Sequence, residues 1–109
     1  MQGSIPIKSG QLDRALAMAQ DLVMAARSEE GCITYEFYRG LSDPDTLVVL
    51  QEWESMDALM AHLSTPHVEA FVRRVPEISD GGITTRRYLV QDVEEAEAVV
   101  VLEQSPIIH

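Results

Sequence analysis

Apolar residues recur at intervals of three and four between residues 12 and 26, and this spacing predicts an amphipathic helix. The residues on this stripe are Leu12, Ala15, Leu16, Ala19, Leu22, Val23 and Ala26. Polar and charged residues fill most positions between them, as expected on the solvent side of a surface helix. Gly31 follows shortly afterwards, and a glycine readily adopts the left-handed conformation that ends a helix. We therefore expect one face of this helix to pack on a core and the chain to turn near residue 31.

Two segments rich in β-branched and aromatic residues come next and predict a β-hairpin. They are CITYEFYRG at 32–40 and TLVVLQEWE at 46–54, joined by the turn sequence LSDPD. Alternation places Ile33, Tyr35 and Phe37 on one face of the first strand. Because apolar residues occupy both faces in the middle of the strands, we expect both faces of the sheet to be covered. A helix layer covers one face, and a second copy of the chain is the simplest cover for the other.

A further helical region is predicted in two parts. Ser55 is a suitable N-cap for the first part. Its expected buried stripe consists of Met56, Leu59, Met60 and Leu63. The Thr65-Pro66 step then restarts the helix, because threonine caps well and proline fits the first helical position. The apolar face continues with Val68, Phe71, Val72 and Val75.

The two ends of the pattern complete a fold. Residues 3–8, GSIPIK, predict a short strand, at an edge or irregular because Pro6 cannot donate a ladder hydrogen bond. Residues 83–90, ITTRRYLV, predict a last core strand. The order strand, helix, strand, strand, helix, strand is that of the ferredoxin-like α+β fold, a split β-α-β protomer with an antiparallel sheet. This domain is expected to span residues 1–90. Residues 91–109 are a C-terminal extension, whose apolar run VVVLEQ either adds an edge strand or reaches a partner.

The composition narrows the possible partners. The 109 residues are 46% apolar with a net charge of −10, which suits one compact domain and disfavours binding to nucleic acid or to an anionic membrane. No run of 18 apolar residues and no signal-peptide pattern is present, so we expect a cytoplasmic protein without a membrane span. Cys32 is the only cysteine, which excludes an internal disulfide. Neither a dinucleotide fingerprint nor a glycine-rich phosphate loop occurs, so no bound NAD or flavin is predicted.

Several motifs, taken in order, resemble the antibiotic biosynthesis monooxygenase family. They are EEGC, YEFYR, DPDT, EWES and HLSTPHVEAF, and the likeness continues through TTRRY, about four-fifths of the chain. The resemblance implies that two ferredoxin-like protomers pack their sheets face to face in a homodimer, a dimeric α+β barrel. It also implies cofactor-independent oxidation of quinols or anthrones by O₂, although other members degrade haem or isomerise a small phosphorylated sugar. The chain contains no asparagine, which the haem degraders place on their first strand, so that activity is disfavoured.

Oxygen insertion without a cofactor requires a base, because a deprotonated phenol is the better reductant. Proton transfer from a phenol of pKa about 10 to an ordinary histidine of pKa about 6.5 is uphill by about 5 kcal/mol, so neighbouring donors must stabilise the anion. His67 matches the family's second histidine and is the leading base, with His62 as a second catalytic histidine. The break at Pro66 allows both rings to reach one cleft, which an unbroken helix would not. Each histidine also has a non-catalytic explanation. His67 would be a residue of the first helical turn that hydrogen-bonds to the backbone, and His62 would be a surface residue.

Three aromatic residues are candidates for substrate binding. Trp53 matches the family's tryptophan in EWES and would form a pocket wall that donates its indole N–H. Tyr35 would hydrogen-bond a substrate oxygen, and Phe71 would close the cavity. Core packing is an equally good explanation for these side chains. No metal site is predicted, because the two histidines lack the i, i+4 spacing and no third ligand is obvious.

Three functions remain open from the sequence. The first is a cofactor-independent monooxygenase of a quinol- or anthrone-like aromatic substrate, working as a homodimer with O₂. The second is an isomerase of a small carbonyl compound, with Arg73 or Arg74 facing a phosphate. The third is a dimeric ligand-binding protein without activity. An apolar cavity favours the first, a small cavity with converging charges the second and a collapsed core the third.

Overall fold

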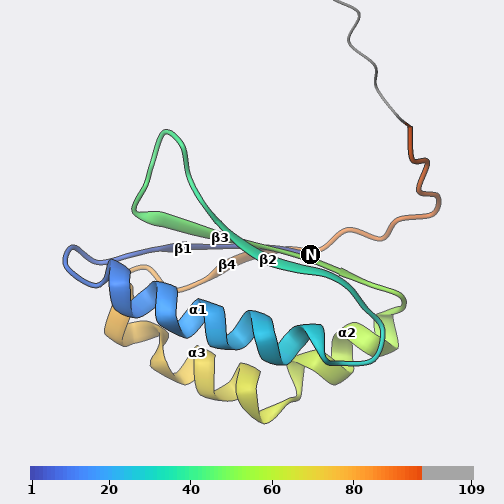
Figure 1. Cartoon of the computed structure of the whole chain (residues 1–109), viewed down its shortest axis with the longest axis horizontal. Coiled ribbons are helices and arrows are strands. Elements are labelled where there is room, and N and C mark those ends of the chain that lie inside the picture. The colour runs from blue at the N-terminus through green and yellow to red at the C-terminus, as the bar shows by residue number, and fades with distance from the viewer. Residues whose placement is uncertain (97–109) are drawn as a thin grey trace, which may run out of the picture.

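The computed structural model describes residues 1–96, with helices and strands in the order β1, α1, β2, β3, α2, α3 and β4 (Figure 1). Their bounds are β1 Gln2–Pro6, α1 Leu12–Arg27, β2 Cys32–Arg39, β3 Thr46–Trp53, α2 Met56–Leu63, α3 Pro66–Ile78 and β4 Thr84–Arg86. The strands form one antiparallel sheet in the order β2-β3-β1-β4. This arrangement confirms the ferredoxin-like α+β fold expected from the sequence.

The helices lie on one face of the sheet, and the opposite face is open (Figure 1). The core between the two layers includes Ile5, Leu47 and Val49 from the sheet and Leu22, Phe71 and Ile78 from the helices. On the open face, Tyr38 and Leu50 are 53% and 40% exposed. A single chain, as far as residues 1–96 describe it, therefore does not cover both faces of its own sheet.

A bulge in β2 changes the predicted alternation of side chains. Cys32 pairs with Trp53 and Thr34 pairs with Glu52, so Ile33 is the extra residue on this strand. The bulge turns Ile33 outward, where it is 62% exposed. The prediction that Ile33 shares the face of Tyr35 and Phe37 is therefore wrong.

β1 is a central strand, because it pairs with β3 on one side and β4 on the other. Pro6 is its last residue. The N–H of Ile7 donates to Asp45 on the β3 side, so the nitrogen of Pro6 points the opposite way, where pairing with β4 has already ended at Ser4. The prediction of an edge strand is wrong, since proline is tolerated here by lying beyond the β4 ladder.

The second helical region begins as predicted but buries a different face. Ser55 accepts a hydrogen bond from the N–H of Ala58, as an N-cap should. Met56 and Met60 are solvent-exposed, whereas Leu59 and His62 are the buried residues of α2. The prediction of a buried methionine stripe is wrong, because the sheet contacts the side of this two-turn helix that carries Leu59 and His62. A histidine therefore occupies a core position.

The last strand is shorter than predicted. β4 contains only Thr84–Arg86, all exposed, and pairs with Gln2 to Ser4 of β1. Arg86 lies opposite Gln2, so β1 has no further strand residue for the chain to pair with. The prediction of a core strand over 83–90 is wrong for this reason. Residues 87–96 form neither helix nor strand, and the apolar run at 99–104 lies outside the described residues.

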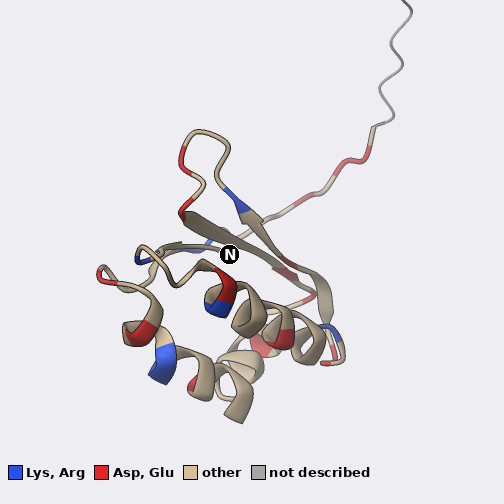
Figure 2. Ribbon diagram, turned by 60° about the vertical axis from the view of Figure 1, so that its left-hand side comes forward, with Lys and Arg blue, Asp and Glu red and all other residues tan. Residues whose placement is uncertain are grey.

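Acidic residues lie on the helices, in the loop between β2 and β3 and along the segment that follows β4 (Figure 2). That segment carries Asp92, Glu94 and Glu95. Within residues 1–96 there is no helix of the length and apolarity that a membrane crossing requires.

Candidate active site

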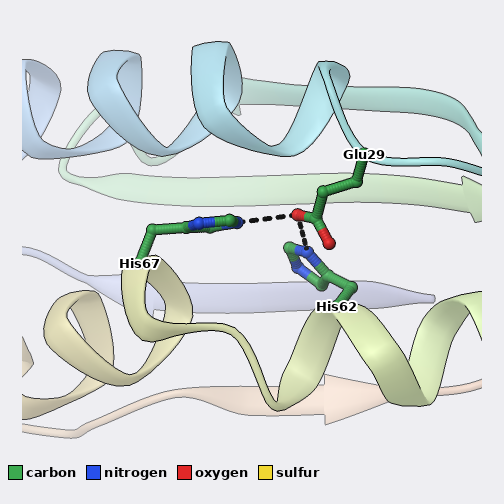
Figure 3. Close-up of side chains that lie close together, drawn as sticks. All are labelled: Glu29, His62 and His67. Carbon is green, nitrogen blue, oxygen red and sulfur yellow. Dashed lines mark hydrogen bonds and ion pairs between the residues drawn. The ribbon is translucent and has the colours of Figure 1, made fainter.

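Both histidines of the HLSTPH segment meet a single carboxylate oxygen (Figure 3). Oε2 of Glu29 lies 2.7 Å from Nδ1 of His62 and 2.7 Å from Nε2 of His67. The ring of His62 is 1% exposed, Glu29 is 16% exposed and His67 is 31% exposed. The three side chains therefore form a continuous polar chain from the protein interior towards solvent.

The turn between α1 and β2 positions Glu29. The N–H of Glu29 donates to Ala26 at the end of α1, and its carbonyl accepts from Cys32 at the start of β2. Gly31 completes the turn with φ of +84°, and a Cβ there would lie 2.6 Å from Cβ of Ala58 on α2. Glycine is therefore required twice, for the backbone conformation and for the close approach of α2, which brings Glu29 to the histidine helices.

Thr65 fixes the junction that brings the two histidines together. Its hydroxyl donates to the carbonyl of His62 at 2.6 Å and accepts from the N–H of Val68 at 3.4 Å. The helix thus ends and restarts within a few residues, with Thr65 as N-cap and Pro66 in the first turn of α3, as the sequence predicted. This break brings the ring centroids of His62 and His67 to 6.0 Å.

The hydrogen-bonding pattern assigns the proton on His62. An ionised carboxylate only accepts hydrogen bonds, so the ring nitrogen that faces Glu29 carries hydrogen. A neutral imidazole then has its lone pair on the other nitrogen, Nε2. In residues 1–96, Nε2 of His62 has no hydrogen-bond partner, which leaves it available to a ligand.

His62 opens into an apolar pocket of about 260 Å³ between the sheet and the helices. The apolar lining includes Leu22, Phe37, Val49, Val68, Phe71 and Ile83. The polar residues of the lining are Tyr35, Gln51, His62 and Thr85, and no Lys, Arg, Asp or Glu side chain of residues 1–96 lines it. The pocket therefore suits a flat apolar molecule that carries a small number of hydroxyl or carbonyl groups.

Two neutral donors share the pocket with His62. Oε1 of Gln51 accepts the indole N–H of Trp53 at 3.0 Å, which leaves the amide N–H₂ of Gln51 to donate elsewhere. The hydroxyl of Tyr35 has no hydrogen-bond partner in the described part of the chain. Burial, followed by the negative charge of Glu29, raises the pKa of Tyr35, so this phenol stays protonated and able to donate.

Aromatic rings hold the imidazole of His62 in place. Trp53 packs against it with ring centroids 4.6 Å apart and planes inclined by 31°. Tyr35 meets the ring edge-on at 5.2 Å. These contacts and the bond to Glu29 leave His62 little freedom to rotate, as a preorganised proton acceptor requires.

His67 faces a different space. It lines a surface groove of about 200 Å³ between α1 and α3, together with Asp21, Ala70 and Arg74. His67 is not among the residues that line the apolar pocket. Phe71 and Leu22 line both spaces and form the wall between them. Glu29 therefore connects one histidine in the pocket with another in the groove.

Comparison with known proteins identifies the family. The antibiotic biosynthesis monooxygenase family matches residues 1–74. The chain belongs to this family. Escherichia coli K12 has a protein named "Probable quinol monooxygenase YgiN", which is 35% identical over 81 residues, covering 65% of this chain and 78% of that protein. A Synechocystis protein named "Uncharacterized protein sll1783" is 30% identical over 76 residues, covering 70% of this chain and 52% of that protein.

A solved structure agrees with this assignment. A crystal structure described as an antibiotic biosynthesis monooxygenase matches with a TM-score of 0.70 at 26% identity, covering 76% of this chain and 87% of that one. The family and the names of its members support a monooxygenase, and hence an oxidoreductase, as the general class. Glu29, His62 and His67 all lie within residues 1–74, the part of the chain that the family matches.

The structure brings together most of the site residues expected from the sequence. His62, Tyr35 and Phe71 line the pocket, whereas His67 lies in the groove. Trp53 is not among the residues that line the pocket, and its indole N–H is already bonded to Gln51. Its observed place is behind His62, so Gln51 presents the donor that we expected from Trp53.

Sequence reasoning missed Glu29 and Gln51. Glu29 belongs to the EEGC motif, which we interpreted only as the exit from a helix. It is separated from His62 by 33 positions, so no local spacing links the two. Glu29 also supplies the third potential metal ligand that was not obvious from the sequence.

Cys32 shows no sign of a reactive thiol, because burial and then the charge of Glu29 raise its pKa.

Proposed function

We propose that this protein is a cofactor-independent monooxygenase that oxidises a quinol-like aromatic compound with O₂, with His62 as the general base. The observation that carries the proposal is the Glu29–His62 pair at the wall of an apolar pocket that also presents two neutral donors. The family membership and the printed name of the relative YgiN support the same reaction class. The geometry favours His62 over His67 as the base, the reverse of the order expected from the sequence.

The first step is proton transfer from a substrate hydroxyl to Nε2 of His62. The imidazolium that forms is stabilised at Nδ1 by the carboxylate of Glu29, 2.7 Å away. Such a carboxylate fixes the tautomer of the ring and offsets its positive charge without itself taking the proton. Glu29 is therefore the positioning residue for the base.

The second requirement is stabilisation of the substrate anion. Tyr35 and Gln51 are neutral donors in the same pocket as His62, and donors that are already oriented at a developing oxyanion lower the barrier. The anion supplies the electrons that O₂ accepts. A quinol and O₂ then give a hydroxyquinone and water, because one oxygen atom enters the ring and the other leaves as water.

The size of the pocket favours a small aromatic substrate. Its volume of about 260 Å³ lies just below the range of roughly 300–1,000 Å³ common for ligand sites. We therefore propose a quinol of one or two rings in preference to a three-ring anthrone.

The groove supports a second candidate, an isomerase of a small, possibly phosphorylated carbonyl compound. Arg74 lines the groove together with His67, so a cation and an imidazole face the same space. In that reaction His67 would move a proton and O₂ would not be consumed. The pocket itself, which is lined by no charged side chain among the described residues, favours the monooxygenase over this isomerase.

We also propose that the active form is a homodimer that joins the open faces of two sheets. The exposed apolar side chains on that face support this assembly, since the described part of one chain offers no cover for them. The partners of the protein are then a second copy, the small aromatic substrate and O₂.

The test is O₂ uptake by metal-free protein with hydroquinones and naphthoquinols, measured for wild type and four variants. We expect His62→Gln and Glu29→Gln to lower the rate on the order of 10²- to 10⁴-fold, as loss of a general base or its orienting carboxylate does. His67→Gln should lose less. Glu30→Gln is the matched control, because Glu30 is exposed and adjacent to Glu29.

Circular dichroism of each variant separates lost chemistry from lost folding. Wild-type protein that consumes no O₂ above the spontaneous rate with any quinol would overturn the monooxygenase. Anaerobic turnover of a carbonyl compound that depends on His67 and not on His62 would favour the isomerase.

A further inference from the structure

We propose that Glu29, His62 and His67 also form a binding site for one divalent transition-metal ion, and that filling the site disables the base. The existence of the site rests on the geometry of the three side chains alone. Only the consequence for catalysis rests on the proposed function of His62. The three residues come from the α1–β2 turn, α2 and α3, so the ion would join three parts of the fold (Figure 3).

The ligand atoms already lie close to a coordination sphere. One atom from each residue, two imidazole nitrogens and a carboxylate oxygen, lie within 4.8 Å of one another. Each nitrogen is 2.7 Å from the shared oxygen. Ligands at about 2.0–2.2 Å from a tetrahedral zinc ion are roughly 3.4 Å apart, so each contact must open by roughly 0.7 Å. His67 in the first turn of α3 and Glu29 in a turn are the groups placed to make this movement.

The donor set determines the class of metal. Two imidazoles with one carboxylate suit zinc, copper or ferrous iron, whereas magnesium and calcium prefer oxygen ligands. Glu29 forms no ion pair with a lysine or arginine in residues 1–96, so its charge is not already neutralised by a strong cation. His67 is partly exposed and lines the groove, which provides a route of entry and room for a water ligand.

Metal binding and base catalysis exclude one another at His62. In the metal-free protein, Nδ1 of His62 carries the proton and Nε2 presents its lone pair to the pocket. A metal ion bound at Nδ1 requires the lone pair on that nitrogen, so the single proton of the neutral ring moves to Nε2. The nitrogen that faces the substrate then becomes a donor and can no longer accept the substrate proton.

Binding is tested by titrating the metal-free protein with Zn²⁺ in a calorimeter and with Co²⁺ in visible absorption. We expect one ion per chain and a Co²⁺ spectrum of low coordination number. Glu29→Gln and His67→Gln should each weaken binding at least tenfold. Glu30→Gln is the matched surface control and His109→Gln tests the remaining histidine, and both should bind as wild type does. Mg²⁺ should give no comparable binding.

The tautomer of His62 gives a readout that does not depend on turnover. A long-range ¹H–¹⁵N spectrum should show the proton of His62 on Nδ1 without metal and on Nε2 after one equivalent of Zn²⁺. One equivalent should also abolish quinol-dependent O₂ uptake, and a chelator should restore it. Binding that is absent, or unchanged in both Glu29→Gln and His67→Gln, overturns the metal site. If the protein oxidises no quinol, the calorimetric and NMR results still decide the metal site separately.

Discussion

At the scale of single residues, the burial of Tyr35 makes the stability of the fold depend on pH in the alkaline range. Tyr35 is 3% exposed, and burial followed by the Glu29 charge raises its pKa above the ordinary tyrosine value. Between the unfolded pKa of about 10 and the folded one, the unfolded chain loses this proton while the native protein keeps it. The contribution of Tyr35 to stability is therefore complete below about pH 10 and is lost as the pH rises, by up to about 1.4 kcal/mol per pH unit.

The measurement is the free energy of unfolding in urea at a series of pH values from neutral to alkaline. Tyr35→Phe should be less sensitive to alkali than wild type, because the titrating group is gone. Tyr88→Phe is the matched control, since Tyr88 is exposed and lies outside the strands. Equal alkaline slopes for wild type and Tyr35→Phe would show that Tyr35 does not carry this effect.

The site could be predicted from the sequence only in part, and Glu29 shows why. A proline step and the family resemblance mark the segment that contains His62 and His67. Their common partner is distant in sequence, and its acidic neighbour Glu30 is chemically identical. Only the turn closed by Gly31 decides that Glu29 points inward while Glu30 is exposed. The positioning role proposed for Glu29 therefore becomes visible only in the folded chain.

At the scale of elements, the junction between α2 and α3 links stability to the site. Ser55 and Thr65 cap the two helices with the same type of hydrogen bond. Thr65 alone also donates to the carbonyl of His62. We expect Ser55→Ala and Thr65→Ala each to cost about 1 kcal/mol in stability, the usual loss for a removed cap. Thr65→Ala should in addition lower quinol oxidation, because the histidine helices are no longer held in register.

Urea unfolding and initial O₂ uptake rates, measured on both variants, check this difference. The contrast matters more than either value, since Ser55→Ala controls for helix destabilisation as such. An equal loss of activity in the two variants would mean that Thr65 acts only as a helix cap.

The helices and strands differ in how well a local sequence pattern predicts them. Local signals predicted the helices, the caps at Ser55 and Thr65 and the hairpin strands, because their hydrogen bonds lie within a few residues. The bulge at Ile33, the central place of β1 and the short β4 depend on pairing between distant strands. The sequence also did not predict which side of α2 is buried. His62 is buried and Met60 is exposed because the sheet and Glu29, both distant in sequence, contact the His62 side of the helix.

At the scale of the whole molecule, helices cover only one of the two faces of the sheet (Figure 1). Val48 and Leu50 from β3 and Tyr38 from β2 lie on the side away from the helices, and Leu50 and Tyr38 are exposed. Exposed apolar groups of this kind, gathered on a sheet face, favour association because their burial stabilises by about 25 cal/mol per Å². The proposed homodimer would provide that burial.

A lysine substitution in the middle of this face tests whether Leu50 belongs to a dimer interface or is simply an exposed leucine. Leu50→Lys should convert the dimer into a monomer, because the face-to-face assembly would bury the two lysines without partners. Leu41→Lys is the matched control, since Leu41 is fully exposed in the hairpin loop between β2 and β3. Light scattering at micromolar concentration should give twice the chain mass for wild type and Leu41→Lys, and the chain mass for Leu50→Lys. A monomeric wild type would contradict the homodimer and would mean that this protein keeps one face of its sheet in water.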